Sequence, residues 1–302
     1  MTGYLLVEMM LAVLLLLGTV SPVLADPLKV VTSFSILGDM ARRVGGDQVL
    51  ITTLVGPDGD AHVYEPTPAD IRAVAQAGLL IVNGLGMEGW MDRLDKAAGY
   101  RGPVVVASTG VRVRHPKGGD GRTTDPHAWQ DLSNGLIYVA NIEAGLAAAD
   151  PTHADTYHAN AKSFSKELKE LDSWVRAEIG SVPPGLRRVI TSHDSFGYFG
   201  EAYGIRLLAP AGIGTEAEIT ARNLATLVTQ IRTTRTRAIF LENMSDPRRI
   251  GQLEREAGAR AGGTLYVDAL SPAGGPAPDY IAMFRHNVPL LKDAMLRNGR
   301  TD

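Results

Sequence analysis

The sequence contains no cysteine among its 302 residues. It therefore offers no disulfide bond, no thiolate metal ligand, no cysteine nucleophile and no cysteine for an N-terminal lipid anchor. We expect any bound metal to be held by nitrogen and oxygen atoms. Aromatic residues are also few, at 6%, but 45% of the chain is hydrophobic, which excludes a disordered chain and allows sizeable cores.

An excess of positive charge is missing as well. The 30 Lys and Arg residues are outnumbered by 33 Asp and Glu residues, and the formal net charge is −3. A protein that holds a phosphate backbone needs a basic surface, so we expect no nucleic-acid partner.

No apolar run is long enough to span a bilayer comfortably. The longest, residues 9–20, is followed by the small residues Val23 and Ala25, which suit a signal-peptidase site. We therefore expect residues 1–25 to be a signal peptide and the mature protein to be periplasmic rather than a lipoprotein. The acidic Glu8 and the lack of Lys or Arg before the run depart from the usual pattern, and a buried N-terminal helix is the alternative.

Short β-rich runs alternate with helical patterns along the rest of the chain, which indicates an α/β fold with mainly parallel sheets flanked by helices. The predicted strands are Leu28–Thr32, Gln48–Val55, Leu79–Val82, Val104–Ala107, Val189–Ser192, Ile205–Leu208, Ala238–Leu241 and Thr264–Val267. The predicted helices are Leu37–Val44, one opened by Thr67, Leu132–Ala149, Glu218–Arg232, Pro247–Ala261 and Tyr280–Arg297.

One segment at the middle of the chain has no Gly or Pro. Thr152–Ile179 is rich in Ala, Lys, Glu and Leu, and it predicts a helix about 42 Å long at 1.5 Å per residue. The simplest organisation is an N-terminal α/β lobe (26–151), a rigid connecting helix (152–180) and a C-terminal α/β lobe (181–302).

Four metal-ligating side chains come just after predicted strands or in the loops between them. They are His62, His127, His193 and Asp268. Ligands bind beyond the carboxyl ends of strands in open α/β sheets, and three imidazoles with one carboxylate would make a four-coordinate site suited to zinc. Taken singly, a histidine at a strand end is more often a hydrogen-bonded structural residue, so spacing alone favours no metal site.

The residues around these positions resemble one family, the zinc and manganese solute-binding proteins of ABC importers. The most specific segment is Gly56–Asp70 (GPDGDAHVYEPTPAD), and further matches are Asn83–Glu88, Asp125–Trp129, Thr191–Phe199 and Val267–Ser271. The resemblance runs in order through residues 28–297. It implies two α/β lobes joined by one long helix, and it makes His62, His127, His193 and Asp268 the metal ligands.

Two departures from the family pattern bear on the metal. The loop Arg112–Asp125 carries only His115, whereas many zinc members have a long His-rich loop there. His193 stands where manganese members usually have Glu, which favours the softer zinc ion over manganese. Because Ala61 replaces the carboxylate that some members have before the first histidine, Asp268 is the better candidate for the fourth ligand.

The resemblance implies a monomeric, non-enzymatic protein that captures Zn²⁺ and delivers it to an ABC-type membrane permease, with Mn²⁺ as the alternative cargo. Binding needs neutral imidazoles and should weaken as pH falls through about 6. A rival interpretation is a secreted zinc hydrolase with Glu216, Glu218 or Glu242 as the base, and a weaker one is an adhesin-like surface protein.

Several neighbouring groups have open roles. Asp60, Glu65 and Asp194 could orient imidazole rings or simply be solvated, and Glu242 ends a strand that points to the same crevice. The pattern GLGMEG at 84–89 matches a dinucleotide-binding motif, but no acidic residue ends the next strand, so a tight turn explains the glycines better.

Overall fold

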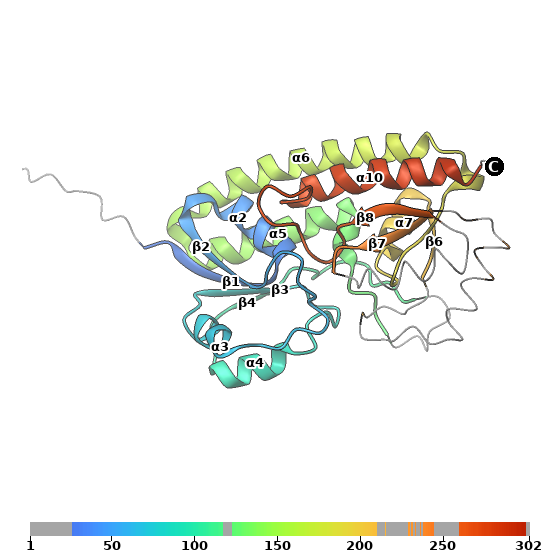
Figure 1. Cartoon of the computed structure of the whole chain (residues 1–302). Helices are drawn as coiled ribbons and strands as arrows, with labels where there is room; N and C mark the ends of the chain where they lie inside the picture. The colour runs from blue at the N-terminus through green and yellow to red at the C-terminus, as the bar shows by residue number, and fades with distance from the viewer. Residues whose placement is uncertain are drawn as a thin grey trace, which may run out of the picture.

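The structure is a computed structural model that describes residues 26–116, 123–209, 215, 229, 231, 233, 236, 238–244 and 260–299. Two four-stranded parallel sheets lie before and after the long helix α6 (Ala154–Gly180) in the chain (Figure 1). The predicted α/β class with two parallel-sheet lobes is therefore confirmed.

The first lobe contains a sheet in the order β2-β1-β3-β4, with every neighbouring pair parallel. Its strands are β1 (Leu28–Phe34), β2 (Val49–Val55), β3 (Leu79–Val82) and β4 (Val104–Val106). Its helices are α2 (Ser35–Gly45), α3 (Pro68–Ala75), α4 (Met91–Ala98) and α5 (Leu132–Ala149). All four residues of β3 are buried, as expected for a central strand covered on both faces.

The second lobe repeats this strand order. Its sheet runs β6-β5-β7-β8, again with parallel neighbours. The strands are β5 (Arg188–Ile190), β6 (Arg206–Leu208), β7 (Ala238–Glu242) and β8 (Arg260–Leu265), and the described helices are α7 (Gly197–Tyr203) and α10 (Tyr280–Arg297). Each sheet therefore has a switch in strand order beside its first strand, and ligands of open α/β sheets bind beyond the carboxyl ends of the strands at such a switch.

Helix α6 ties the two lobes together. It has 27 residues, about 40 Å at 1.5 Å per residue, and it contacts α2 and α5 of the first lobe and α7 and α10 of the second. Figure 1 shows α6 and α10 side by side along one edge of the molecule. The predicted connecting helix is confirmed, and we retain 26–151, 152–180 and 181–302 as a proposed division of the chain.

Some predicted boundaries are wrong. Strand β8 spans 260–265 and ends three residues before Asp268, so Asp268 does not close its strand directly. Residues 260 and 261 belong to β8, which means that the helix predicted for Pro247–Ala261 does not reach its end. The start of this strand could not be predicted because Gly262 and Gly263 are residues that strands disfavour, and the register of β8 on β7 shifts at this point.

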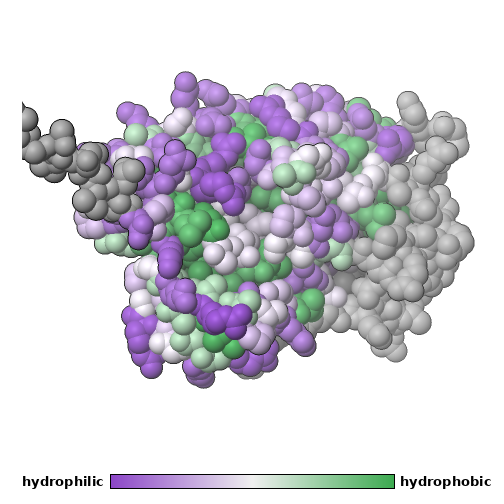
Figure 2. Space-filling model, turned by 60° about the vertical axis from the view of Figure 1, so that its left-hand side comes forward, coloured by the Kyte–Doolittle hydropathy of each residue, from purple (hydrophilic) through white to green (hydrophobic). Residues whose placement is uncertain are grey.

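Other predictions fall on residues outside the described ranges. These are the signal peptide at 1–25, most of Pro247–Ala261, and the helix Glu218–Arg232 apart from Thr229 and Ile231, which are helical. Among the described residues, no helix has the length and apolarity needed to cross a membrane. On the face shown in Figure 2, hydrophilic residues cover most of the described surface and apolar ones form small separate patches.

Candidate metal centre

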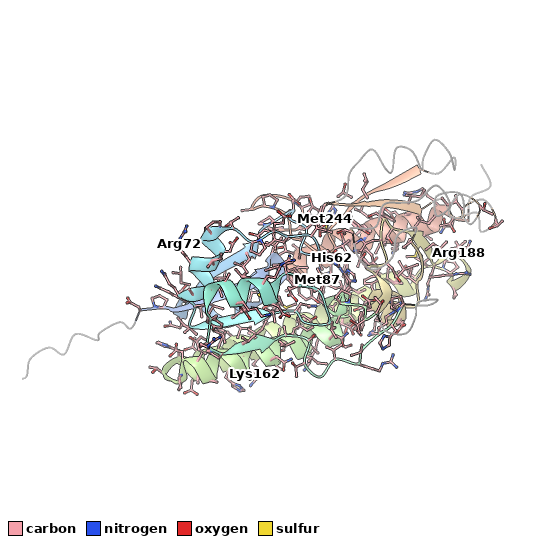
Figure 3. The ribbon with its side chains drawn as sticks, turned by 90° about the horizontal axis from the view of Figure 1, so that it is seen from below. His62, Arg72, Met87, Lys162, Arg188 and Met244 are labelled. Atoms are coloured by element: carbon pink, nitrogen blue, oxygen red, sulfur yellow. The ribbon has the colours of Figure 1, made fainter. Side chains whose placement is uncertain are left out.

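His62, His127, His193 and Asp268 come together between the two lobes. His62 lies in the loop after β2, His127 just before the short helix η2 (Ala128–Gln130), His193 after β5 and Asp268 after β8. One ligand atom from each lies within 4.8 Å of all the others. In Figure 3, His62 lies near the middle of the molecule, whereas Arg72 and Arg188 lie toward opposite ends.

The three imidazoles turn the same ring atom toward one point. Nε2 of His127 lies 3.2 Å from Nε2 of His62 and 3.3 Å from Nε2 of His193. Four ligands at 2.0–2.1 Å around a tetrahedral zinc lie about 3.3 Å from one another. The spacing of the nitrogens therefore fits a single ion of that size without rearrangement.

Asp268 completes the cluster on the fourth side. Its Oδ2 lies 3.1 Å from Nε2 of His193 and 3.4 Å from Nε2 of His62, and its Oδ1 lies 3.5 Å from Nε2 of His127. The side chain is fully buried, and neither oxygen accepts a hydrogen bond from any described residue. A buried carboxylate that accepts no hydrogen bond is costly unless a cation faces it, either a protonated imidazole or a metal ion, and the convergence of four ligand atoms on one point fits a metal ion.

The charges of the cluster reinforce one another. Burial alone would raise the pKa of Asp268, but the adjacent His127 and His193 hold it well below its usual range. Burial alone would lower the pKa of His127, but Asp268 and the hydrogen bond to Asp125 outweigh it and raise the pKa of His127 to about 9. Without a cation, the site therefore holds protons at neutral pH.

Buried carboxylates orient two of the imidazoles from behind. Nδ1 of His127 donates to Oδ1 of Asp125 at 2.7 Å, and Arg114 Nη1 holds the other oxygen of Asp125 at 2.6 Å. Nδ1 of His193 donates to Glu242, at the end of β7. Glu242 and Asp268 raise the pKa of His193 well above its usual value, although burial opposes them. Both rings thus present Nε2 to the centre.

The third imidazole is held differently. The backbone N–H of His62 donates to Oδ1 of Asp60 at 2.9 Å, and the preceding Ala61 carbonyl accepts a 2.8 Å hydrogen bond from the indole of Trp90. Asp60 thus orients the backbone of the loop and not the imidazole ring. The side chain of His62 is 8% exposed, more than that of His127 or His193.

The remaining histidines lie outside the cluster. His153 pairs with Asp150, His286 with the Thr264 carbonyl and His115 with the Thr123 carbonyl. His158 lies 3.8 Å from Glu143. These contacts agree with the structural roles that the sequence favours for such residues.

The glycines of 84–89 form a tight turn between β3 and α4. Gly84 and Gly86 have φ of 80° and 84°, and Leu85 between them has φ of 55°. The carboxylate of Glu88 accepts hydrogen bonds from the backbone N–H groups of Asn83 and Gly84, so it fills the place a phosphate would take. These contacts and the positive φ angles agree with the tight turn that the sequence favours over a dinucleotide site.

Sequence reasoning missed Asp125 as an orienting group. It lies in the motif Asp125–Trp129, two residues before His127, where a short side chain can reach Nδ1 of the histidine ring. Asp194, considered for this role, is partly buried, and burial raises its pKa while Arg114 opposes this. No hydrogen bond of Glu65 is found with any described residue.

Two parallel α/β lobes joined by a long helix, with a buried cluster of three imidazoles and one carboxylate between them, define a solute-binding protein for a small cation. The family described as zinc-uptake complex component A, periplasmic (ZnuA), matches residues 30–294. The chain belongs to this family.

Similar proteins match this chain over most of their length. The chain is 32% identical to the iron-binding protein YfeA of Yersinia pestis, over 87% of this chain and 85% of that protein. It is 32% identical to the manganese-binding lipoprotein MntA of Bacillus subtilis, over 89% of this chain and 90% of that protein. The periplasmic zinc-binding protein TroA of Treponema pallidum superposes with a TM-score of 0.86 at 27% identity, covering 90% and 100% of the two chains.

Together these findings make the chain a metal-binding, extracytoplasmic substrate-binding protein of ABC transporters. Proteins of this kind carry a substrate and are not enzymes, which excludes the hydrolase interpretation.

Proposed function

We propose that this protein captures Zn²⁺ with His62, His127, His193 and Asp268 and delivers it to an ABC-type membrane permease. The observation that carries this proposal is the orphaned, fully buried carboxylate of Asp268 facing three Nε2 atoms. Four protein ligands would fill a tetrahedral shell and leave no position for a catalytic water.

The donor set favours zinc among the divalent ions. Three imidazole nitrogens suit a borderline-soft ion, and the buried carboxylates behind two of them, Asp125 and Glu242, raise the basicity of the rings. The TroA protein, which is named for zinc, supports the same choice through its similar fold.

Manganese is the alternative cargo. Both oxygens of Asp268 face the ring nitrogens, so a bidentate carboxylate could raise the coordination number for a harder ion. The similarity to MntA, which is named for manganese, favours this alternative as well.

We further propose that the protein works as a monomer in the periplasm. MntA is named a lipoprotein, whereas this sequence has no cysteine to carry a lipid. Cleavage of a signal peptide at residues 1–25 would release a mature protein that reaches its permease by diffusion. Mass spectrometry of the exported protein should show a mature N-terminus near Asp26 and no lipid.

The metal is tested by loading under competition. The protein is exported by cells grown with both zinc and manganese, purified without chelator, and its metal content and coordination number are measured by mass spectrometry and X-ray absorption. We expect one four-coordinate zinc per chain. Manganese at five or six coordination would establish the alternative, and protein that retains no divalent ion would overturn the proposal.

A further inference from the structure

The three imidazoles of the cluster are not held equally. His127 and His193 each have a buried carboxylate, Asp125 and Glu242, on Nδ1, and these two histidines are almost fully buried. His62 has no carboxylate hydrogen-bonded to its ring among the described residues, and it is the most exposed of the three. The ring of His62 is therefore the ligand that needs the fewest broken contacts to move away.

The position of His62 depends on the loop between β2 and α3. Within this loop, Gly59 N–H donates to the Gly56 carbonyl at 3.1 Å. Asp58 is the residue that reaches across to the second lobe. Its backbone N–H donates to the Leu270 carbonyl at 3.0 Å, and its Oδ1 accepts a 2.8 Å hydrogen bond from Nδ2 of Asn243. Asp58 has a left-handed φ of 56°, which aspartate tolerates better than most residues.

Both partners of Asp58 belong to segments that hold other parts of the metal cluster. Leu270 follows Asp268 by two residues, and Asn243 comes directly after Glu242. Asp58 therefore connects the loop of His62 to the segment that carries Asp268 and to the segment whose Glu242 orients His193.

The side chain of Asn243 is fixed in orientation. Its backbone N–H donates to the Leu265 carbonyl at 3.0 Å. Its Nδ2 lies 2.8 Å from Oδ1 of Asp58 and 3.4 Å from the carbonyl of Ala269, both of which are acceptors, so the NH₂ group must face them. The amide therefore turns its donor to Asp58, while its Oδ1 has no hydrogen-bond partner among the described residues.

Elsewhere the lobes are joined by contacts that do not involve the His62 loop. Val267 accepts hydrogen bonds from the indole of Trp129 and from Gln130, both at 2.9 Å, and Leu270 N–H donates to Ser35 at 2.9 Å. All these contacts would have to break for the lobes to separate. Displacing the loop breaks the two hydrogen bonds of Asp58 to the second lobe and the bond of the Ala61 carbonyl to Trp90.

We propose that the Asp58–Asn243 hydrogen bond is a latch that holds the His62 loop against the second lobe and sets the rate at which the bound divalent ion leaves. Asp58 and Asn243 act as positioning residues and do not touch the ion. The inference rests on the proposed function, because it takes His62 as a ligand.

Two substitutions open the latch in different ways. Asp58→Gly keeps the left-handed backbone and the N–H to Leu270 but removes the side-chain acceptor. Asn243→Ala removes the donor and keeps the backbone bond to Leu265. Since the net contribution of one hydrogen bond is small, we expect either variant to release zinc about 2- to 10-fold faster. The double variant should release it no faster than the more affected single variant, since one interaction is lost in each case.

Release is measured by stopped flow, mixing zinc-loaded protein with excess chelator. Asn160→Ala is the matched control, because Asn160 Nδ2 also donates one inter-element hydrogen bond, to the Val44 carbonyl at 3.0 Å, away from the cleft. Its release rate should equal that of the wild type. Asp58→Asn, which keeps an acceptor, should restore most of the slow release. When the latch variants are loaded with cobalt, their absorption spectra should still show a four-coordinate ion.

The two possible failures are distinguishable. Wild-type protein that retains zinc while both latch variants release it at the wild-type rate overturns the latch and leaves the proposed function intact. Additive acceleration in the double variant also overturns it, because the residues would then act separately. Wild-type protein that binds no divalent ion overturns the proposed function and the latch with it.

Discussion

Glu242 accepts a hydrogen bond from Nδ1 of His193 and thereby links the end of β7 to the residue that follows β5. Both side chains are almost fully buried, so the carboxylate fixes the ring and leaves only Nε2 for the centre. The sequence offered two roles for Glu242, an outer group or the base of a hydrolase. Its contact with Nδ1 agrees with the first, since Nδ1 is the ring atom that does not face the other three ligands.

Glu242→Gln should weaken zinc binding about 10- to 100-fold, because the neutral amide accepts the same hydrogen bond but lowers the basicity of the ring. Isothermal titration of metal-stripped protein measures the change. Glu178→Gln, which removes one charge from a pair with Lys292, is the control and should leave affinity unaltered. Equal affinities of the wild type and Glu242→Gln would show that the carboxylate does not act through His193.

Asp268→Ala should reduce zinc affinity by more than about 100-fold, since it removes a proposed ligand and the negative charge that compensates the ion. Competition with a fluorescent chelator gives the affinity. Asp92→Ala, at an exposed position of α4, is the matched control. An Asp268→Ala protein that keeps wild-type affinity would mean that the three histidines bind the ion with a water as fourth ligand.

Zinc binding should release protons at neutral pH. The pKa of His127 is about 9 in the absence of metal, so its proton must leave when the ion enters. Affinity should therefore rise with pH up to about 9, by about tenfold per pH unit for each proton displaced. Titrations in two buffers of different ionisation enthalpy count the protons. Heats that do not depend on the buffer would contradict the expectation.

This range lies above the value near 6 that unperturbed histidine suggests. The difference arises because Asp268 and Asp125 surround His127 in a buried site. The sequence contains both aspartates, but their distance from the ring depends on tertiary structure. For this reason, the sequence and the structure predict the same direction of the pH dependence but different ranges.

Strongly patterned elements were predictable to the residue. Helix α5 is Leu132–Ala149 as expected, and α10 is Tyr280–Arg297, because each has an aspartate N-cap, Asp131 and Asp279, before an apolar stripe. Helix α7 was missed, because GYFGEAY contains two glycines and three aromatic residues and resembles no amphipathic helix. Its burial against the rest of the lobe overrides that local preference.

The clustering of the four central side chains could be predicted because motifs surround each of them, and their role as metal ligands stays a prediction. The orienting groups were harder to find. Arg114 reaches Asp125 from a loop with no helical or strand pattern, and Asn243 meets Asp58 across 185 residues. Pairs of this kind are set by how the lobes pack, and no local pattern in the sequence records them.

Gly197→Ala should disturb the centre from a distance. A Cβ at this position would lie 2.0 Å from Nη1 of Arg114 and 2.6 Å from Oδ2 of Asp125, so that pair must shift and His127 loses its fixed partner. We expect zinc affinity to fall about tenfold, within the range for outer groups of metal sites. Gly180→Ala, which meets no atom within 4 Å, is the control. Unchanged affinity for Gly197→Ala would separate the Arg114–Asp125 pair from metal binding.

Asp39 should make the stability of the protein depend on pH. It lies on α2 and accepts a 3.0 Å hydrogen bond from the backbone N–H of Tyr280, at the start of α10. Burial raises its pKa from 3.8 to about 6, although the Tyr280 N–H and Arg43 oppose the shift. The folded state therefore holds this proton more tightly than the unfolded state, and the stability that it contributes below pH 4 is lost as pH rises through 6.

A shift of this size corresponds to up to about 3 kcal/mol between pH 4 and pH 7. Asp39→Asn keeps an acceptor for Tyr280 and does not ionise, so its unfolding free energy should fall less than that of the wild type over this range. Urea unfolding of metal-stripped protein at several pH values measures both curves, with Asp47→Asn at an exposed position as the control. Parallel curves for wild type and Asp39→Asn would show that Asp39 ionises alike in the folded and unfolded chains.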